Sequence, residues 1–416
     1  MAVVLIGTLD TKGGELGFVR DLLRARGLAT IVVDVGSLAP PTLDADIGRS
    51  EVLRLAESTA SGDRGESVAA MARGAARLLA NLHRDGRVDG VFGLGGSAGT
   101  VIASAAMRGL PFGLPKVLVS TLASGSTRPF LEASDIALFP PVADLAGLNR
   151  LTRVALGNAG NALAGMVEGW GDANRTAPAD QPAPVVVAAT MFGVTTRCVD
   201  RARGTLEALG KEAGRSVEVL VFHATGVGGQ AMEGLIRDGL VDAALDLTTT
   251  ELADELVGGI LSSGPDRLKA AVARGIPQVV GVGAMDMVNF GPRSTVPERF
   301  SHRTFHIHNP SVTLMRTTPD ENARLGARMA EILRECTAPT VVLLPQGGVS
   351  AIDVPGNPWH DPLANRALFD AIRLGLADHP FVTVVDRPEA INNPSFADFA
   401  ATRLFSLIHP EATPSP

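Results

Sequence analysis

The sequence predicts an α/β protein with two domains, each built on a mainly parallel sheet. Short β-branched runs alternate with longer segments of helical periodicity, which is the pattern of β-strands joined by crossover helices. The pattern restarts after a segment rich in Pro, Ala and Asp at residues 171–184. A chain of 416 residues is also too long for one ordinary core and suits two domains.

The first predicted domain covers residues 1–175, and a linker is expected at 176–184. Its strands are short β-branched runs, and the segments between them carry apolar residues at helical spacing. Strands are expected at 3–6, 29–33, 88–94, 116–119 and 136–139, and helices at 14–26 and 67–81.

The second predicted domain covers residues 185–416 and repeats the plan of the first. In both halves a strand leads into a Thr-bearing loop and a helix, and a later strand ends in glycines. We therefore expect two similar Rossmann-like domains with an interdomain cleft. Strands are expected at 185–189, 217–222, 241–246, 278–282 and 340–344, and helices at 195–209, from 231 and at 318–335.

Composition places the chain among soluble globular proteins. Apolar residues make up 45% and charged residues 19%, and no run approaches the ~18 apolar residues that a membrane span needs. The net charge of −7, without a basic stripe, argues against nucleic acid as a partner. Cys198 and Cys336 lack metal-ligand spacing, so each is expected to be a small buried side chain. Because the N-terminus has the pattern of a first β-strand and not that of a signal peptide, the expected compartment is the cytoplasm.

Three loops of the first domain are candidates for holding an anion. Each follows an expected strand, and in doubly wound sheets ligands lie beyond the carboxyl ends of the strands. Backbone N–H groups at a helix N-terminus, with hydroxyls nearby, are the groups that bind a phosphate. The candidate residues are Gly7, Thr8, Asp10, Thr11 and Lys12 in the first loop, Gly95, Gly96, Ser97, Gly99 and Thr100 in the second, and Thr121, Ser124 and Gly125 in the third.

The second loop is the hardest to explain by packing alone. A helix that only packs on a sheet needs one small residue at this junction, whereas residues 95–100 hold three glycines and two hydroxyls. The first loop matches neither a P-loop nor a dinucleotide fingerprint, and a turn with a helix cap explains it equally well. The Ser/Thr run of the third loop also suits local turns, so its weight comes from its position.

Other polar residues leave structural and functional roles open. Asp144 and Asn149 follow the fifth strand and suit ligand contact or helix capping, with capping the simpler expectation. The ordered loop around Trp359, His360 and Asp361 suits a ligand lid or an interface clasp, although Trp359 also suits core covering.

The second domain carries its own glycine loop and a possible metal cluster. Residues 222–230 repeat the glycine pattern of a strand end. His306 and His308 alternate, so an extended strand would place them on one side, where they could share a metal ion. The carboxylates that could complete such a site are Asp246, Glu251, Asp286 and Asp353. Because two histidines without a third ligand are more often structural, no metal ligand and no catalytic residue is assigned.

Several long motifs occur in order over nearly all of residues 1–385: IGTLDTKGGEL, GVFGLGGSAGT, STLASG, ATMFGVTT, FHATGVGGQAME, HNPSVTLMRT and LPQGGVSAIDVPGNPWHDP. In these the chain resembles the family of the ATP-binding domain of the tomato mosaic virus resistance protein and its bacterial relatives. The resemblance implies two α/β subdomains, ATP binding in the first, and a homodimer. Carried onto this sequence, it assigns ATP to the three loops of the first domain.

We therefore expect an ATP-binding protein that acts on or senses a small metabolite in the interdomain cleft. The phosphates are expected on backbone amides and on Thr8, Lys12, Ser97 and Thr100. Magnesium, if used, is expected on Asp10 or Asp144.

Two alternatives stay open at this point. One is a metal-assisted hydrolase or lyase that uses the His and carboxylate cluster of the second domain. The other is a non-catalytic nucleotide-binding module. The histidines that could serve as a general base are His223, His306 and His308.

Overall fold

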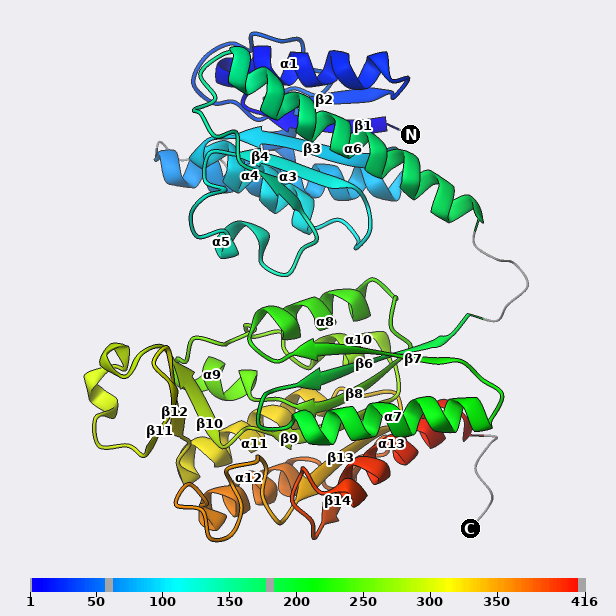
Figure 1. Cartoon of the computed structure of the whole chain (residues 1–416), viewed down its shortest axis with the longest axis vertical. Helices are drawn as coiled ribbons and strands as arrows, with labels where there is room; N and C mark the ends of the chain where they lie inside the picture. Colours follow the sequence, from blue (N-terminus) through cyan, green and yellow to red (C-terminus); the bar gives the residue numbers. More distant parts are fainter. Residues whose placement is uncertain (1, 57–62, 177–182, 411–416) are drawn as a thin grey trace. The chain divides into compact units, whose positions relative to one another are not determined.

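The structure is a computed structural model that describes residues 2–56, 63–176 and 183–410, with the backbone alone for 172–176 (Figure 1). The chain divides into two compact units, Met1–Asp180 and Gln181–Pro416. The expected linker at 176–184 lies mostly outside the described residues.

The first unit is a parallel sheet covered by helices on both faces. Its strands lie in the order β2-β1-β3-β4-β5, and every pairing is parallel. All six residues of β1 are buried, as expected of a strand covered on both sides. The strands are β1 (Ala2–Gly7), β2 (Thr30–Asp34), β3 (Val88–Gly95), β4 (Lys116–Ser120) and β5 (Ala137–Phe139).

Alternate side chains of β1 serve the two faces of this sheet. Leu5 packs with α1 (Leu9–Ala25) and α6 (Arg150–Thr176), whereas Val4 and Ile6 pack with α3 (Arg64–Arg84) and α4 (Ser97–Arg108). Figure 1 shows α1 beside α6, and α3 beside α4. The remaining helices of the unit are the short α2 (Arg49–Leu55) and α5 (Arg128–Leu131).

The second unit repeats this arrangement with six parallel strands in the order β14-β13-β9-β8-β6-β7. The strands are β6 (Val185–Met191), β7 (Val217–His223), β8 (Ala243–Thr248), β9 (Gln278–Gly283), β13 (Thr340–Pro345) and β14 (Val382–Arg387). One face is covered by α7 (Thr196–Glu212) and α13 (Pro394–Ile408). The other face carries α8 (Val227–Arg237), α10 (Lys269–Arg274), α11 (Pro319–Leu333) and α12 (Pro362–Gly375).

A small antiparallel sheet is inserted between β9 and α11. Its strands are β10 (Met287–Phe290), β11 (Phe305–Asn309) and β12 (Val312–Arg316), in the order β10-β12-β11. Two 3₁₀ turns, Arg293–Thr295 and Glu298–Phe300, join β10 to β11, and a short helix, α9 (Glu251–Val257), follows β8. The sequence did not predict this sheet.

The prediction of two α/β domains with mainly parallel sheets is confirmed. Cys198 and Cys336 are free and buried, as expected, and burial raises the pKa of Cys198 to about 12. In the described ranges, no helix combines the length and the apolar character needed to cross a bilayer.

Candidate functional site

The three candidate loops of the first unit lie side by side at one edge of its sheet. β1, β3 and β4 are neighbours, so their carboxyl ends at Gly7, Gly95 and Ser120 are adjacent. The strand order reverses between β1 and β3, which is where open α/β sheets bind ligands. Thr121 N–H donates to Gly95 C=O (3.4 Å), and the hydroxyls of Thr100 and Ser120 lie 2.6 Å apart. The edge expected from the sequence is therefore formed.

The first turn of α4 offers backbone N–H groups to a ligand. Gly96 is the N-cap of this 12-residue helix and has no side chain to cap it. Within the described residues, the N–H groups of Ser97, Ala98 and Gly99 have no hydrogen-bond acceptor, whereas Thr100 N–H donates to Gly96 C=O (2.9 Å). Unpartnered N–H groups and the aligned peptide dipoles together make a helix N-terminus attractive to an anion.

The glycines of this loop differ in what packing demands of them. A Cβ on Gly95 would lie 2.6 Å from Gly99 Cα, so packing excludes any side chain there. A Cβ on Gly99 would lie 3.2 Å from Leu94 O, which a small shift could relieve. A Cβ on Gly96 would find no atom closer than Thr121 Oγ1, at 3.9 Å. The fold thus requires Gly95 but leaves open space at Gly96.

The loop after β1 borders this space. Thr8 is the N-cap of α1, and its hydroxyl lies 2.9 Å from the hydroxyl of Thr11. A Cβ on Gly99 would lie 4.0 Å from Thr8 Cγ2, which places the first loop next to the first turn of α4. The side chains of Thr8, Thr11, Ser97 and Thr121 are partly or fully exposed at this edge. Hydroxyls from all three loops are therefore accessible.

Two residues expected to contact the ligand are engaged within the protein. Asp10 Oδ2 accepts hydrogen bonds from the backbone N–H groups of residues 37–39, at 2.7–3.3 Å. Lys12 Nζ donates to Leu145 C=O. Both side chains fasten neighbouring loops to the start of α1, and the structure gives them this supporting role.

Thr100 is buried, whereas the tip of the third loop is exposed. Thr100 is fully buried, and its hydroxyl contacts Ser120 Oγ and Gly95 C=O (3.3 Å), so it joins two loops from inside. Ser124 and Gly125 are exposed at the tip of the third loop.

Asp34, at the end of β2, is a residue that the sequence analysis missed. Its carboxylate is 2% exposed, and Oδ1 accepts hydrogen bonds from the N–H groups of Leu9 (3.2 Å) and Gly36 (2.8 Å). Arg49 Nε lies 3.7 Å from its other oxygen. Asp34 thus takes the first N–H group of α1, whereas no acceptor among the described residues contacts the first three N–H groups of α4. An acidic residue at a strand end was the signal available.

The residues after β5 behave mainly as expected. Asn149 Oδ1 accepts hydrogen bonds from the N–H groups of Leu151 (2.9 Å) and Thr152 (3.0 Å), which confirms the capping role. Asp144 is exposed and accepts a hydrogen bond from Leu145 N–H (2.8 Å).

The glycine loop of the second unit binds a carboxylate of the protein itself. Glu251, at the start of α9, is fully buried. Its Oε1 accepts hydrogen bonds from the N–H groups of Gly226 (2.7 Å) and Gly229 (3.0 Å). A Cβ on Gly229 would lie 2.1 Å from Glu251 Oε2. Gly228 is explained by the His223 carbonyl oxygen, 1.9 Å from where its Cβ would lie, and Gly226 by its φ of 88°. These glycines therefore need no external ligand.

Arg267 completes a buried ion cluster around Glu251. Its Nε donates to Glu251 Oε2 (2.7 Å), Nη2 donates to Asp246 Oδ1 (2.7 Å), and Nη1 lies 3.3 Å from Glu233 Oε1. Burial raises the pKa of Glu233 and of Glu251, while the Arg267 charge opposes the shift. Asp246 and Glu251, expected as possible metal ligands, are therefore committed to Arg267.

The histidines of β11 lie on an exposed strand. His306 and His308 are exposed, and the expected extended strand is confirmed. The His306 ring stands edge-on to Trp359, with 6.2 Å between ring centroids. Across residues 2–56, 63–176 and 183–410, no three His, Cys, Asp or Glu side chains are grouped so that they could hold a metal ion. The described residues therefore provide no set of ligands for the metal ion considered in the sequence analysis.

The loop around Trp359 is anchored by its own side chains. Trp359 is 4% exposed and covers a small apolar cluster, which is the structural role considered for it. Asp361 caps α12, since its Oδ1 accepts hydrogen bonds from the N–H groups of Leu363 and Ala364, both at 3.0 Å.

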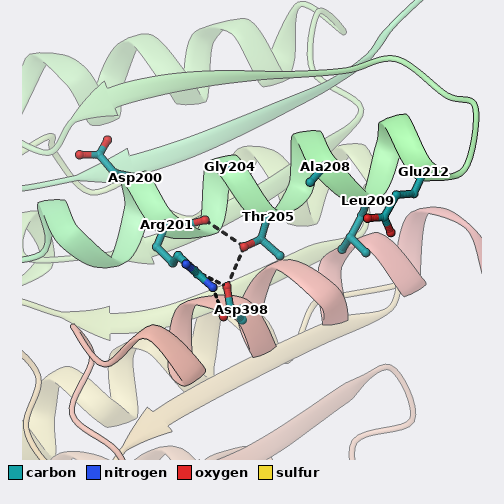
Figure 2. Close-up of a pocket in the computed structure, with 8 residues that line it drawn as sticks. All are labelled: Asp200, Arg201, Gly204, Thr205, Ala208, Leu209, Glu212 and Asp398. Carbon is teal, nitrogen blue, oxygen red and sulfur yellow. Dashed lines mark hydrogen bonds and ion pairs between the residues drawn. The ribbon is translucent and has the colours of Figure 1, made fainter.

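A surface pocket of the second unit runs along α7 beside α13 (Figure 2). Arg201 donates two hydrogen bonds to Asp398, at 2.7 and 2.8 Å, and Thr205 Oγ1 donates to the same carboxylate (2.7 Å). The cation of this pocket is thus already paired. The pocket is lined by Asp200, Arg201, Gly204, Thr205, Ala208, Leu209, Glu212 and Asp398.

Two family models together match nearly the whole chain. The N-terminal domain model of the uncharacterised protein family UPF0261 matches residues 1–171, and its C-terminal domain model matches residues 184–408. The chain belongs to the UPF0261 family. A UPF0261 protein of Clostridium tetani is 44% identical over 411 residues, which cover 98% of each chain.

Relatives of this UPF0261 protein extend to plants. The tomato ToMV resistance protein Tm-1(GCR237) is 41% identical over 416 residues, which cover 95% of this chain and 54% of the tomato protein. This chain therefore corresponds to about half the length of that relative. Among solved structures, a UDP-GlcNAc 2-epimerase from Neisseria meningitidis bound to UDP-GlcNAc is 13% identical, covering 67% of this chain and 82% of its own, with a TM-score of 0.24. A likeness at that level supports no argument about ligand or activity.

Proposed function

We propose that the first unit binds ATP, with its phosphates at the N-terminus of α4. One observation carries the proposal: no acceptor in the described part of the chain contacts the N–H groups of Ser97, Ala98 and Gly99, which lie beside the open space at Gly96. This helix start lies where the strand order reverses, at the position that favours ligand binding. The choice of ATP comes from the family resemblance, and the donor set fits a phosphate.

The side chains of the three loops divide into contacting and supporting groups. The accessible hydroxyls of Thr8, Thr11, Ser97 and Thr121 donate to phosphate oxygens in the proposed complex. Asp10 and Lys12 hold the surrounding loops, and Thr100 joins the second loop to the third. Ser124 and Gly125 lie at the exposed tip, where they border the rest of the nucleotide.

A magnesium ion bound with the nucleotide would be held by a carboxylate of the first unit. Asp10 Oδ2 already accepts three backbone N–H groups, which makes it a poor additional ligand. Asp144 is exposed, and its neighbour Leu145 receives the Lys12 hydrogen bond, so Asp144 is the carboxylate we assign to the ion. Bound magnesium supplies charge neutralisation for the phosphates.

Calorimetry with the wild-type protein tests the proposal. ATP, ADP, inorganic phosphate and ribose 5-phosphate are titrated separately, each with and without magnesium. We expect ATP to bind most tightly and phosphate to compete weakly for the same site. Undetectable ATP binding contradicts the proposal. If ribose 5-phosphate binds more tightly than ATP, the anion site at α4 is supported but the choice of ATP as its ligand is contradicted.

The bound ATP serves, in this proposal, to act on or to sense a small metabolite. Phosphate release over hours, measured with a panel of candidate metabolites, separates these two roles. Release stimulated by one metabolite identifies an ATP-dependent enzyme, and bound but unhydrolysed ATP identifies a nucleotide-binding module.

We also propose that the protein is a homodimer, as the resemblance implies, and that it works in the cytoplasm. Sedimentation equilibrium gives the mass in solution, and a mass of one chain contradicts the dimer. Cell fractionation tests the compartment.

A further inference from the structure

A histidine and a carboxylate of the second unit form a hydrogen-bonded pair after β13. His360 Nδ1 lies 2.9 Å from Asp353 Oδ1, and Asp353 is fully buried. The other oxygen of Asp353 accepts hydrogen bonds from Val349 N–H (3.0 Å) and Asn365 Nδ2 (2.7 Å). Since a carboxylate in this position accepts, the neutral imidazole carries its proton on Nδ1 and a lone pair on Nε2.

The second ring nitrogen of His360 is open. The side chain is 17% exposed, and no residue in the described part of the chain bonds to Nε2. A histidine oriented by a buried carboxylate through one nitrogen, with the other nitrogen accessible, has the arrangement of a general base.

Arg316 fixes the backbone on both sides of this histidine. Its Nε donates to the carbonyl of Trp359 (3.1 Å), and its Nη2 donates to the carbonyl of Asp361 (3.3 Å). Nη1 donates to the carbonyl of Asp286 (3.2 Å). Every nitrogen of Arg316 is thus bonded to a protein oxygen. The guanidinium holds the loop in place and is not available to bind an anionic substrate.

The charged groups beside the pair favour an uncharged substrate. Asp353 and Asp286 are fully buried carboxylates, and Arg316 Nη2 lies 3.6 Å from Asp353 Oδ1. Because every nitrogen of Arg316 is bonded to a protein oxygen, an anionic substrate would meet no free arginine among the described residues that contact the pair. Trp359, the neighbour of His360 in the chain, belongs to a buried apolar cluster.

The nearby serine is not placed to act as a nucleophile. Ser350 is 1% exposed, and its hydroxyl donates to Asp286 Oδ2 (2.8 Å). Trp359 Nε1 donates to the same oxygen (2.7 Å). With Ser350 excluded, water is the attacking group that we assign.

We propose that His360, oriented by Asp353, is the general base of a hydrolytic site for uncharged carboxylic esters. Nε2 takes a proton from water as the water oxygen bonds to the ester carbon. The bond from that carbon to the alcohol oxygen then breaks, and the proton on Nε2 passes to the departing alkoxide. The products are a carboxylic acid and an alcohol, and no oxidant or cofactor is needed. This site is independent of the proposed ATP site.

Ester hydrolysis by the full chain tests the proposal directly. p-Nitrophenyl acetate is the uncharged probe, and p-nitrophenyl phosphate is the anionic comparison. We expect the wild type to hydrolyse the acetate above the buffer rate and His360→Asn to lose about 100-fold of that rate or more. His306→Asn is the matched control, because His306 also lies beside Trp359 but pairs with no carboxylate among the described residues, and it should retain the rate.

Three results overturn the proposal: no acetate hydrolysis by the wild type, an unchanged rate in His360→Asn, or a preference for the phosphate ester. Imidazole added to His360→Ala should restore part of the rate, which a purely structural histidine would not allow. Failure of imidazole to restore any rate, in a variant whose thermal melting matches the wild type, also counts against the base.

Asp353 is a positioning residue in this proposal, and the tautomer of His360 reports its role. Nitrogen NMR of the wild type at about pH 8 should show the proton on Nδ1 and a bare Nε2, and the opposite tautomer contradicts the proposal. Asp353→Asn removes the charge of the positioning carboxylate and should lower the rate of ester hydrolysis. If this variant fails to fold, the NMR measurement and the His360 variants still test the role of His360 as a general base.

Discussion

Arg267 and Glu251 form an ion pair of 2.7 Å in which both side chains are fully buried. Burial of a charged pair is favourable only when hydrogen bonds satisfy both partners, and here Gly226 and Gly229 complete the shell of Glu251. The glycine loop after β7, the start of α9 and the segment before α10 therefore depend on one another.

Replacing Arg267 by Met should destabilise the second unit by about 3–5 kcal/mol, because it leaves three carboxylates buried without their cation. Urea denaturation of the full chain measures the loss. Arg201→Met is the control, since the Arg201–Asp398 pair is exposed on α7 and α13 (Figure 2) and its removal should change stability little. Equal effects of the two substitutions would show that the buried cluster has no special importance.

Gly229→Ala should destabilise the protein by about 1–3 kcal/mol, because its Cβ would lie 2.1 Å from Glu251 Oε2. Gly234→Ala in the same helix is the control. Its Cβ would meet nothing closer than the Arg237 guanidinium at 3.8 Å, so it should gain up to about 1 kcal/mol of helix propensity. Thermal melting compares the two, and a stable Gly229→Ala protein would refute the assigned contact.

Asp254→Asn should make the protein more stable at neutral and alkaline pH. Burial raises the pKa of Asp254 to about 7, so the folded state keeps a proton that the unfolded chain releases near its ordinary pKa of about 4. Wild-type stability from this group is therefore greatest below about pH 4 and is lost as the pH rises to about 7.

The amide of Asn cannot titrate, and the buried, unpartnered Oδ1 of Asn289 could accept its N–H after a flip of the Asn289 amide. The difference in unfolding free energy between Asp254→Asn and the wild type should grow between about pH 5 and pH 8, by about 2–3 kcal/mol. Denaturation curves at these two pH values check it, and a difference independent of pH would exclude a raised pKa.

The sequence predicted the parallel sheets because parallel strands that are buried on both faces are short, nearly continuous apolar runs. β1 is an unbroken run of buried residues, β3 is interrupted only by the half-buried Asp89, and both were placed within two residues of their ends. Apart from the extended strand expected at His306 and His308, the small antiparallel sheet escaped prediction because its pairing depends on distant residues. Strand order, which brings the three loops together, is likewise a non-local property.

The sequence predicted which loops form the site, but not which of their residues serve packing and which are free to contact a ligand. Glycine and hydroxyl content marked the loop at residues 95–100, yet composition could not show that Gly95 serves packing and Gly96 does not. Nor could it show that Glu251 occupies the second glycine loop, because the two lie more than twenty residues apart in the chain. Such carboxylate-to-loop contacts become visible only in three dimensions.

Gly95→Ala provides the packing control for the proposed nucleotide site. Its Cβ would lie 2.6 Å from Gly99 Cα, so the variant should lose about 1–3 kcal/mol of stability. Denaturation measures that loss, and a fully stable Gly95→Ala protein would contradict the close approach of α4 to β3.

The most direct test is a calorimetric titration of Gly96→Val with ATP beside the wild type. Gly96 has extended backbone angles that valine tolerates, and its Cβ meets no atom within 3.9 Å, so folding should suffer by only about 1 kcal/mol. The added side chain would fill the space in front of the first turn of α4. We predict that the wild type binds ATP and that Gly96→Val, melting at nearly the same temperature, binds it at least about tenfold more weakly. Equal ATP affinity in the two proteins would contradict phosphate binding at this helix.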